Sequence, residues 1–348
     1  MTSLASSRLR TLQLVPLLAL AALVVVFSSV YPRFATIDNL LNILTQGAPL
    51  AIASAGMAFV LLTAGVDLSA GSVMFLTAVV AGKSALAGLP LAGVLAASVA
   101  VGTACGGLNG LLVARLRFVP FIVTLGTLYL WRGLGLEISQ TRAMNLPENL
   151  RSVASAFLGI PIPIWILAGV VAAAAVLLER TGFGRQIYAV GYDAEAARKA
   201  GVPVIRVLSF VYFASGFCAG LAGLISIAQM GAVSPTFGEQ REFSAIAAAV
   251  LGGVSLFGGR GSVFPGTLLG ALLIQAIDNG LVIAGADPYL YPVITAAVIF
   301  IAVLLDSIRH RRLQTMARRP IRRCERLESQ EISDVEPQRK TQRIDRRA

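Results

Sequence analysis

The chain alternates long apolar runs with short polar breaks, and ten of these runs predict helices. Many of the runs reach about 18 residues or more, which is enough to cross roughly 30 Å of hydrocarbon as an α-helix. The ten predicted helices cover residues 12–30, 42–63, 70–87, 91–114, 118–136, 164–178, 207–230, 243–256, 263–283 and 289–305. The pattern predicts an all-α polytopic membrane protein with about ten transmembrane helices, in one transmembrane domain over residues 12–306.

Composition supports a lipid environment. Of the 348 residues, 56% are hydrophobic and 14% are charged, whereas soluble domains carry about 25% charged residues. The 34 glycines suit close packing of helices in lipid. The bilayer is therefore the first predicted partner.

The two ends of the chain are basic. Residues 1–11 and the first apolar run resemble a signal peptide, but no small-x-small cleavage site follows, so we interpret the run as the first helix and keep cleavage as the alternative. The tail, residues 309–348, has 13 basic and 6 acidic residues and is predicted to be disordered. Its charge favours a cytoplasmic location over nucleic-acid binding, so no nucleic-acid partner is expected.

The basic residues also predict the orientation. Ten crossings place both termini on one side, and 23 of the 29 Lys and Arg residues share that side. By the positive-inside rule this side is the cytoplasm. The polar stretch 180–206 then faces the cytoplasm, and the stretch 137–163 faces outside.

The stretch 180–206 contains the signals of a short helix. Asp193 fits the N-cap, Glu195 lies in the first turn and Arg198 lies in the last, while Gly201 fits the left-handed position after the helix. Two turns are too short to be stable alone in water. We therefore expect the helix to be held by other parts of the protein or by a partner.

One side of this short helix is small and flat. Ala196, Ala197 and Ala200 lie on it, and the charges lie on the other side. Such a helix suits a shallow groove on a partner protein. The alternative is an ordinary solvated loop helix.

Polar residues interrupt the apolar segments. Asp67 is the only carboxylate between the first and sixth helices that fits membrane depth, where an ionisable residue is a functional candidate; capping the next helix is the alternative. The candidates for a solute pathway are Asp67, Ser69, Ser72, Asn109, Ser255, Gln275 and Asn279. Interhelical hydrogen bonding is the alternative for the residues inside helices.

A short internal repeat accompanies these polar residues. The sequence GVDL followed by GSV at 65–73 returns as GVSL followed by GSV at 253–263. Paired interruptions in the two halves of a transporter indicate its pathway. Independent use of the same turn residues is the alternative.

Missing motifs limit the chemistry. The sequence has no P-loop and no nucleophile–base set, and the single histidine, His310, lies at the end of the last helix. The three cysteines have no metal-ligand spacing. We therefore predict no catalytic residue, metal or bound cofactor. The absence of a chain of buried carboxylates also argues against an ion-coupled carrier, so the energy must come from a partner.

Three segments resemble a known family. Residues 63–72 (TAGVDLSAGS), 184–191 with 195–201 (GRQIYAVG, EAARKAG) and 245–261 (AIAAAVLGGVSLFGGRG) are similar to signatures of permease subunits of ribose-type ABC sugar importers. Order and spacing are kept, and the resemblance spans residues 39–306. One departure is Ser244, where the family usually has Asp or Glu, with Glu242 two residues earlier.

The resemblance implies a transport subunit of the bacterial inner membrane rather than an enzyme. Its implied partners are a cytoplasmic ABC ATPase, which binds ATP and Mg²⁺, an extracytoplasmic solute-binding protein and a second permease copy, identical or not. The stretch 180–206 becomes the ATPase-coupling loop, and its implied coupling residues are Asp193, Glu195, Ala196, Ala197, Arg198 and Gly201.

The resemblance also implies a solute. A monosaccharide such as ribose, xylose or galactose is favoured by the DLS and LGG signatures. Related permeases for nucleosides, branched-chain amino acids or a furanose signal remain alternatives. An ion-coupled secondary carrier is the alternative from another class.

Overall fold

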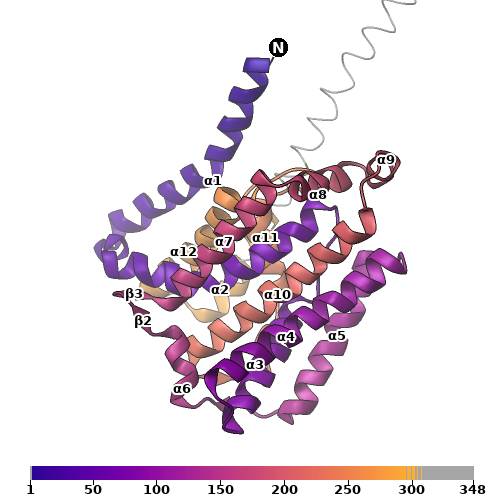
Figure 1. Cartoon of the computed structure of the whole chain (residues 1–348). Coiled ribbons are helices and arrows are strands. Elements are labelled where there is room, and N and C mark those ends of the chain that lie inside the picture. The colour runs from indigo at the N-terminus through magenta and orange to yellow at the C-terminus, as the bar shows by residue number, and fades with distance from the viewer. Residues whose placement is uncertain (1, 295, 299, 302–303, 305–306, 308–348) are drawn as a thin grey trace, which may run out of the picture. The chain divides into compact units, whose positions relative to one another are not determined.

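Helices dominate the chain in the computed structural model (Figure 1). The structure describes residues 2–294, 296–298, 300–301, 304 and 307, and side chains only from residue 16 onward. The longer helices are α1 (Thr2–Val30), α2 (Ile37–Leu62), α3 (Ala70–Leu86), α4 (Leu91–Gly110), α5 (Pro120–Ser139), α7 (Ile162–Arg180), α10 (Val204–Met230), α11 (Arg241–Leu251) and α12 (Leu268–Ile283). The predicted tail 309–348 and part of the predicted helix 289–305 lie outside the described residues.

Among the residues that the structure describes, six helices are long and apolar enough to cross a membrane. They are Ile37–Leu62, Leu91–Arg115, Pro120–Ser139, Ile162–Arg180, Val204–Met230 and Val263–Ile283. Shorter apolar helices include Pro16–Val30 and Ala70–Leu86. These segments confirm an all-α polytopic membrane protein.

α11 is shorter than the sequence pattern predicted. The predicted helix 243–256 is replaced by an 11-residue helix that ends at Leu251, which rises only about 16 Å. Gly253 has φ of +91°, and the Val254 amide turns back to the Ala249 carbonyl oxygen at 3.0 Å. The apolar run continues past this turn, which is why hydrophobicity alone placed the helix end too late.

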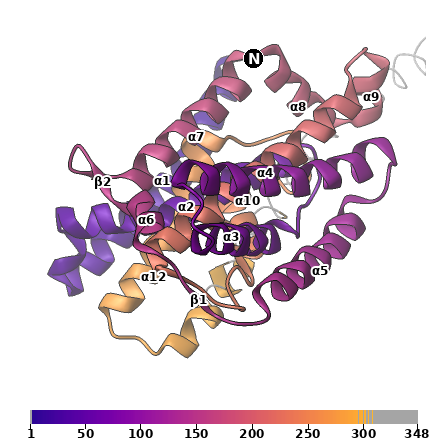
Figure 2. The ribbon, with the colours of Figure 1, turned by 60° about the horizontal axis from the view of Figure 1, so that its bottom comes forward.

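α2 and α10 lie at the centre of the helices. In the apolar 18-residue stretch of each helix, 83% of the residues of α2 and 67% of those of α10 are buried, compared with 22% of those of α5. α10 packs against α2, α3 and α4, and α2 also packs against α7, α11 and α12. Figures 1 and 2 show α10 between α2 and α4.

Glycines bring α4 and α10 close together. A β-carbon on Gly102 would lie 2.6 Å from the Gly216 carbonyl oxygen, and one on Gly106 would lie 2.9 Å from the Gly216 Cα. The spacing of small residues four apart lets the two backbones touch. This close approach fixes α4 against the central helix.

Short elements connect the long helices at both ends. At one end lie α6 (Glu148–Arg151) and two small antiparallel sheets, in which β1 (Met144–Asn145) pairs with β4 (Ala232–Val233) and β2 (Ala156–Phe157) pairs with β3 (Ile160–Pro161). At the other end, α8 (Gly182–Tyr192) and α9 (Ala194–Lys199) join α7 to α10. The sequence did not predict α8, because three glycines obscure its helical pattern.

Candidate functional site

α9 has the capping geometry that its sequence predicts. The Asp193 Oδ1 accepts hydrogen bonds from the backbone amides of Glu195 and Ala196, both at 2.9 Å. Gly201 has φ of +84°, a left-handed conformation that costs glycine little. These local bonds define both ends of a six-residue helix.

The charges of α9 face outward. Arg198 and Lys199 lie 3.7 and 3.4 Å from the Glu195 carboxylate, and the three side chains are 60 to 75% exposed. Such exposed pairs add little stability. They leave a charged surface available to a partner.

Ala197 lies on the opposite side of α9 and is only 6% exposed. It belongs to the hydrophobic core of its own chain. The prediction that Ala197 packs against a partner is therefore corrected: Ala197 holds α9 in place, whereas Ala196 is exposed. The sequence showed three alanines on one side, Ala196, Ala197 and Ala200, and could not distinguish which of them the protein interior covers.

α8 connects α9 to two glycine-rich breaks in the helical structure. The first break, residues 63–69, lies between α2 and α3, and the second, residues 252–262, follows α11. A β-carbon on Gly191, near the end of α8, would overlap the Leu62 carbonyl oxygen at the end of α2. The Gly259 amide donates to the same oxygen at 2.9 Å. The Tyr188 hydroxyl, also on α8, donates to the Gly261 carbonyl oxygen at 2.9 Å. We call Gly191, Leu62 and Gly259, with the Tyr188 bond, the three-way junction.

The residues just before the first repeated segment therefore meet the second repeated segment in space. Gly258 has φ of +79°, and a β-carbon there would lie 2.8 Å from the Ala64 side chain. Ala64 itself has φ of +58°. The breaks after α2 and after α11 thus pack against each other and against α8.

Asp67 lies in a buried polar cluster between helices. It is 1% exposed, and its Oδ1 accepts from the Ser69 amide at 3.0 Å and hydroxyl at 2.6 Å. Its Oδ2 accepts from the Ser215 hydroxyl of α10 at 2.7 Å. The Asn109 Nδ2 of α4 donates to the Ser69 hydroxyl at 2.8 Å. Asp67 thereby ties the α2–α3 break to α10 and, through Ser69, to α4.

The other pathway candidates are spread over the protein. The Ser72 hydroxyl donates to the Ser69 carbonyl oxygen at 2.7 Å, which places Ser72 beside the Asp67 cluster. The Ser255 hydroxyl accepts from the Phe257 amide at 3.2 Å in the second break. Asn279 accepts from Asn39 at 2.9 Å, at the opposite end of the helices from α9. The predicted set is thus not one site.

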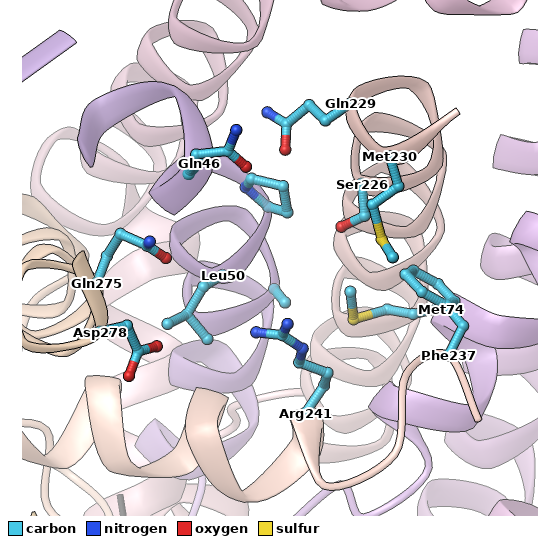
Figure 3. Close-up of a pocket in the computed structure, with 12 residues that line it drawn as sticks. Gln46, Leu50, Met74, Ser226, Gln229, Met230, Phe237, Arg241, Gln275 and Asp278 are labelled. Carbon is cyan, nitrogen blue, oxygen red and sulfur yellow. The ribbon is translucent and has the colours of Figure 1, made fainter. Parts of the chain in front are cut away.

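Gln275 lines a cleft at the end of the helices opposite α9. The cleft lies between α2, α10, α11 and α12 (Figure 3). The cleft has a volume of about 180 Å³. Its polar lining consists of Gln46, Ser226, Gln229, Arg241, Gln275 and Asp278. Gln46 and Arg241 were missed in the sequence; the available signal for Gln46 was an amide near the start of an apolar helix.

A larger groove lies beside α9. Its volume is about 910 Å³. Residues from α9, the start of α10 and the α4–α5 link line it, among them Glu195, Arg198, Pro203, Arg117 and Phe118. The groove also reaches Thr63 and Gly65 of the first break. The exposed charges of α9 thus border a hollow that extends toward the α2 end.

Within the part of the chain that the structure describes, no three His, Cys, Asp or Glu side chains are grouped to hold a metal ion. The two described cysteines, Cys105 and Cys218, are buried and free. What the arrangement offers is a polar cleft at one end and an exposed charged helix at the other.

Comparison with known proteins places these features in a family. The family model described as branched-chain amino acid transport system / permease component matches residues 39–303. The ribose import permease protein of Escherichia coli K12 is 40% identical over 303 residues, covering 84% of this chain and 92% of its own. The D-allose transport system permease protein of the same strain is 37% identical, with 83% and 90% covered. The fructose import permease protein of Rhizobium meliloti is 37% identical, with 84% of each chain covered.

Proposed function

The chain belongs to the family of branched-chain amino acid transport system permease components, and from that premise we propose that it is the permease subunit of an ATP-driven importer of a monosaccharide. The observation that carries the proposal is the set of relatives, 37 to 40% identical, that import ribose, allose or fructose. The subunit transports and does not catalyse a reaction. It is a multi-pass protein of the inner membrane.

The proposed topology has ten crossings and two cytoplasmic termini. α9 then lies on the cytoplasmic side, where 23 of the 29 basic residues collect, and the cleft with Gln275 opens outside. α3 and α11 are the short segments of this arrangement. Their backbone breaks are buried against other helices, as irregular backbone within a membrane must be.

The proposed partners are a cytoplasmic ATPase, a solute-binding protein outside and a second permease copy. ATP and Mg²⁺ bind to the ATPase and not to this chain. Asp193, Glu195, Ala196, Arg198 and Gly201 form the exposed part of the coupling helix, and its charged face next to the 910 Å³ groove supports this role.

The three-way junction supports a route for coupling. α8 leads into α9 through one extended residue, Asp193, and touches both glycine-rich breaks through Gly191 and Tyr188. A displacement of α9 by the ATPase therefore moves the ends of α2 and the α11–α12 link together. These breaks are where the pathway changes between outward and inward access.

The proposal is tested by reconstitution. The chain, its ATPase and its binding protein, the latter two taken from neighbouring reading frames, are placed in proteoliposomes, and uptake of labelled ribose, allose and fructose is measured. Uptake that requires ATP and both partners supports the proposal. If leucine or a nucleoside is taken up and no sugar is, the proposal that the solute is a monosaccharide is wrong. If this chain alone accumulates solute under an ion gradient, it is a secondary carrier.

A further inference from the structure

We infer that the cleft between α2, α10, α11 and α12 receives the solute from outside and recognises a neutral polyol, with Asp278 and Gln275 of α12 as specificity-determining residues. The inference rests on the proposed importer function. It adds a solute site inside one copy of the chain. The cleft volume of about 180 Å³ suits a small solute rather than a peptide or lipid.

The polar groups of the cleft combine donors with acceptors. Three glutamine amides each offer N–H donors and a carbonyl oxygen, and Ser226 offers a hydroxyl. Every hydroxyl of a polyol is likewise both donor and acceptor. Figure 3 shows Gln275 and Asp278 entering from α12, Gln46 from α2, and Gln229 from α10 on the side away from α12. Such a mixed lining satisfies several hydroxyls at once.

The charges of the cleft balance. Arg241 and Asp278 supply one cation and one anion, from α11 and α12. A phosphorylated sugar would need excess positive charge, and a cation would need excess negative charge. A zwitterionic amino acid would pair with both charges but would leave the three amides without a matching group, and unmatched polar groups weaken binding. The lining therefore favours a neutral polyol.

Packing behind the lining fixes these side chains. The Gln229 Nε2 donates to the Thr45 carbonyl oxygen at 2.7 Å, which leaves the Gln229 oxygen as an acceptor. Gly47 lies against the Gln275 stem, because a β-carbon there would be 3.1 Å from its Cγ. A prearranged amide loses less entropy on binding than a mobile one.

The apolar side of the cleft also has support. Leu50, Met74 and Phe237 line it and offer carbon surface to the C–H groups of a sugar (Figure 3). The Arg132 guanidinium donates to the Phe237 carbonyl oxygen at 2.7 Å and lies 4.5 Å from the Phe75 ring centroid. Arg132 therefore positions the segment that carries Phe237.

The test uses the complete transporter in proteoliposomes, with ribose, allose and fructose as probes. Asp278→Asn keeps the size of the side chain and removes its charge, and Gln275→Leu keeps the stem that packs against Gly47. The expected result for each is about a tenfold fall in sugar delivered per ATP hydrolysed. Stimulation of ATP hydrolysis by the loaded binding protein should stay within about twofold of wild type, because docking and coupling are intact.

The controls separate recognition from folding. Asp38→Asn removes an exposed carboxylate at the same end of the helices and should transport like wild type. Asp278→Glu restores the charge and should recover part of the uptake. If Asp278→Asn retains wild-type uptake, or loses uptake and ATPase stimulation in parallel, the cleft is not a solute site although the importer function stands. If wild type delivers only leucine, or no solute with ATP, the proposed function fails and the inference fails with it.

Discussion

The backbone amide of Gly259 donates a 2.9 Å hydrogen bond to the carbonyl oxygen of Leu62, so the α11–α12 link is joined to the end of α2. Gly191 of α8 lies against the same oxygen and has no space for a β-carbon. Three segments that are far apart in the sequence thus meet at one carbonyl oxygen, which accepts a hydrogen bond from one of them. A movement of α8 is therefore expected to disturb the packing of the other two segments.

The first prediction concerns this junction. Gly191→Ala should separate α8 from the end of α2 and lower ATP-driven uptake by about tenfold or more, because the new methyl group overlaps backbone atoms that have little freedom to move. Uptake and ATP hydrolysis are measured in proteoliposomes. The matched control is Gly182→Ala on the same helix, where a β-carbon would meet only the far end of Arg185 at 3.6 Å. Equal uptake by both variants would show that the junction does not transmit motion.

The second prediction concerns Asp67. Asp67→Ala removes the acceptor of the Ser69 amide and of the Ser69 and Ser215 hydroxyls. Buried donors without partners each cost about 1–3 kcal/mol, so a loss of roughly 3 kcal/mol in unfolding free energy is expected. Thermal unfolding in detergent measures the change. Asp38→Ala, at an exposed position, should have a small effect; an equal effect of the two variants contradicts the importance of the cluster.

The third prediction compares neighbouring glycines of α4. Gly106→Ala should destabilise the contact with α10, because its β-carbon would lie 2.9 Å from the Gly216 Cα and N; overpacking of this kind costs about 1–3 kcal/mol. Gly107→Ala meets no atom within 4 Å and should gain up to about 1 kcal/mol of helix propensity. Reaction of the buried Cys105 and Cys218 thiols with a fluorescent reagent during heating reports unfolding. The prediction fails if the two variants change the melting temperature in the same direction.

The fourth prediction concerns the exposed charges of α9. Glu195→Gln should leave the melting temperature unchanged, because its pairs with Arg198 and Lys199 are exposed. It should reduce the amount of copurified ATPase about tenfold if Glu195 meets a charged group of the partner. Glu137→Gln, exposed at the other end of the protein, is the control. Normal ATPase recovery with Glu195→Gln would remove this residue from the proposed docking surface.

Local signals made some features predictable. The N-cap role of Asp193 and the left-handed Gly201 depend only on residues within a few positions, and both are confirmed in the structure. α8 was missed because Gly182 and Gly184 weaken its propensity. Its stability comes from Ile187 and Val190, which are buried against other helices. The burial of Ala197 was missed because the residues that cover it are far away in the sequence.

The cleft, too, could be predicted from the sequence only in part. Gln275 was a candidate because an amide inside an apolar helix is unusual, but its grouping with Gln46, Arg241 and Asp278 requires α2, α11 and α12 to be placed side by side. The sequence alone determined the membrane class, most helices and the capped short helix α9, because hydrophobic length and capping are properties of continuous segments. Only the tertiary structure decided which polar groups meet, where α11 ends and which side of α9 is free. These features depend on packing and hydrogen bonds between residues that are distant along the chain.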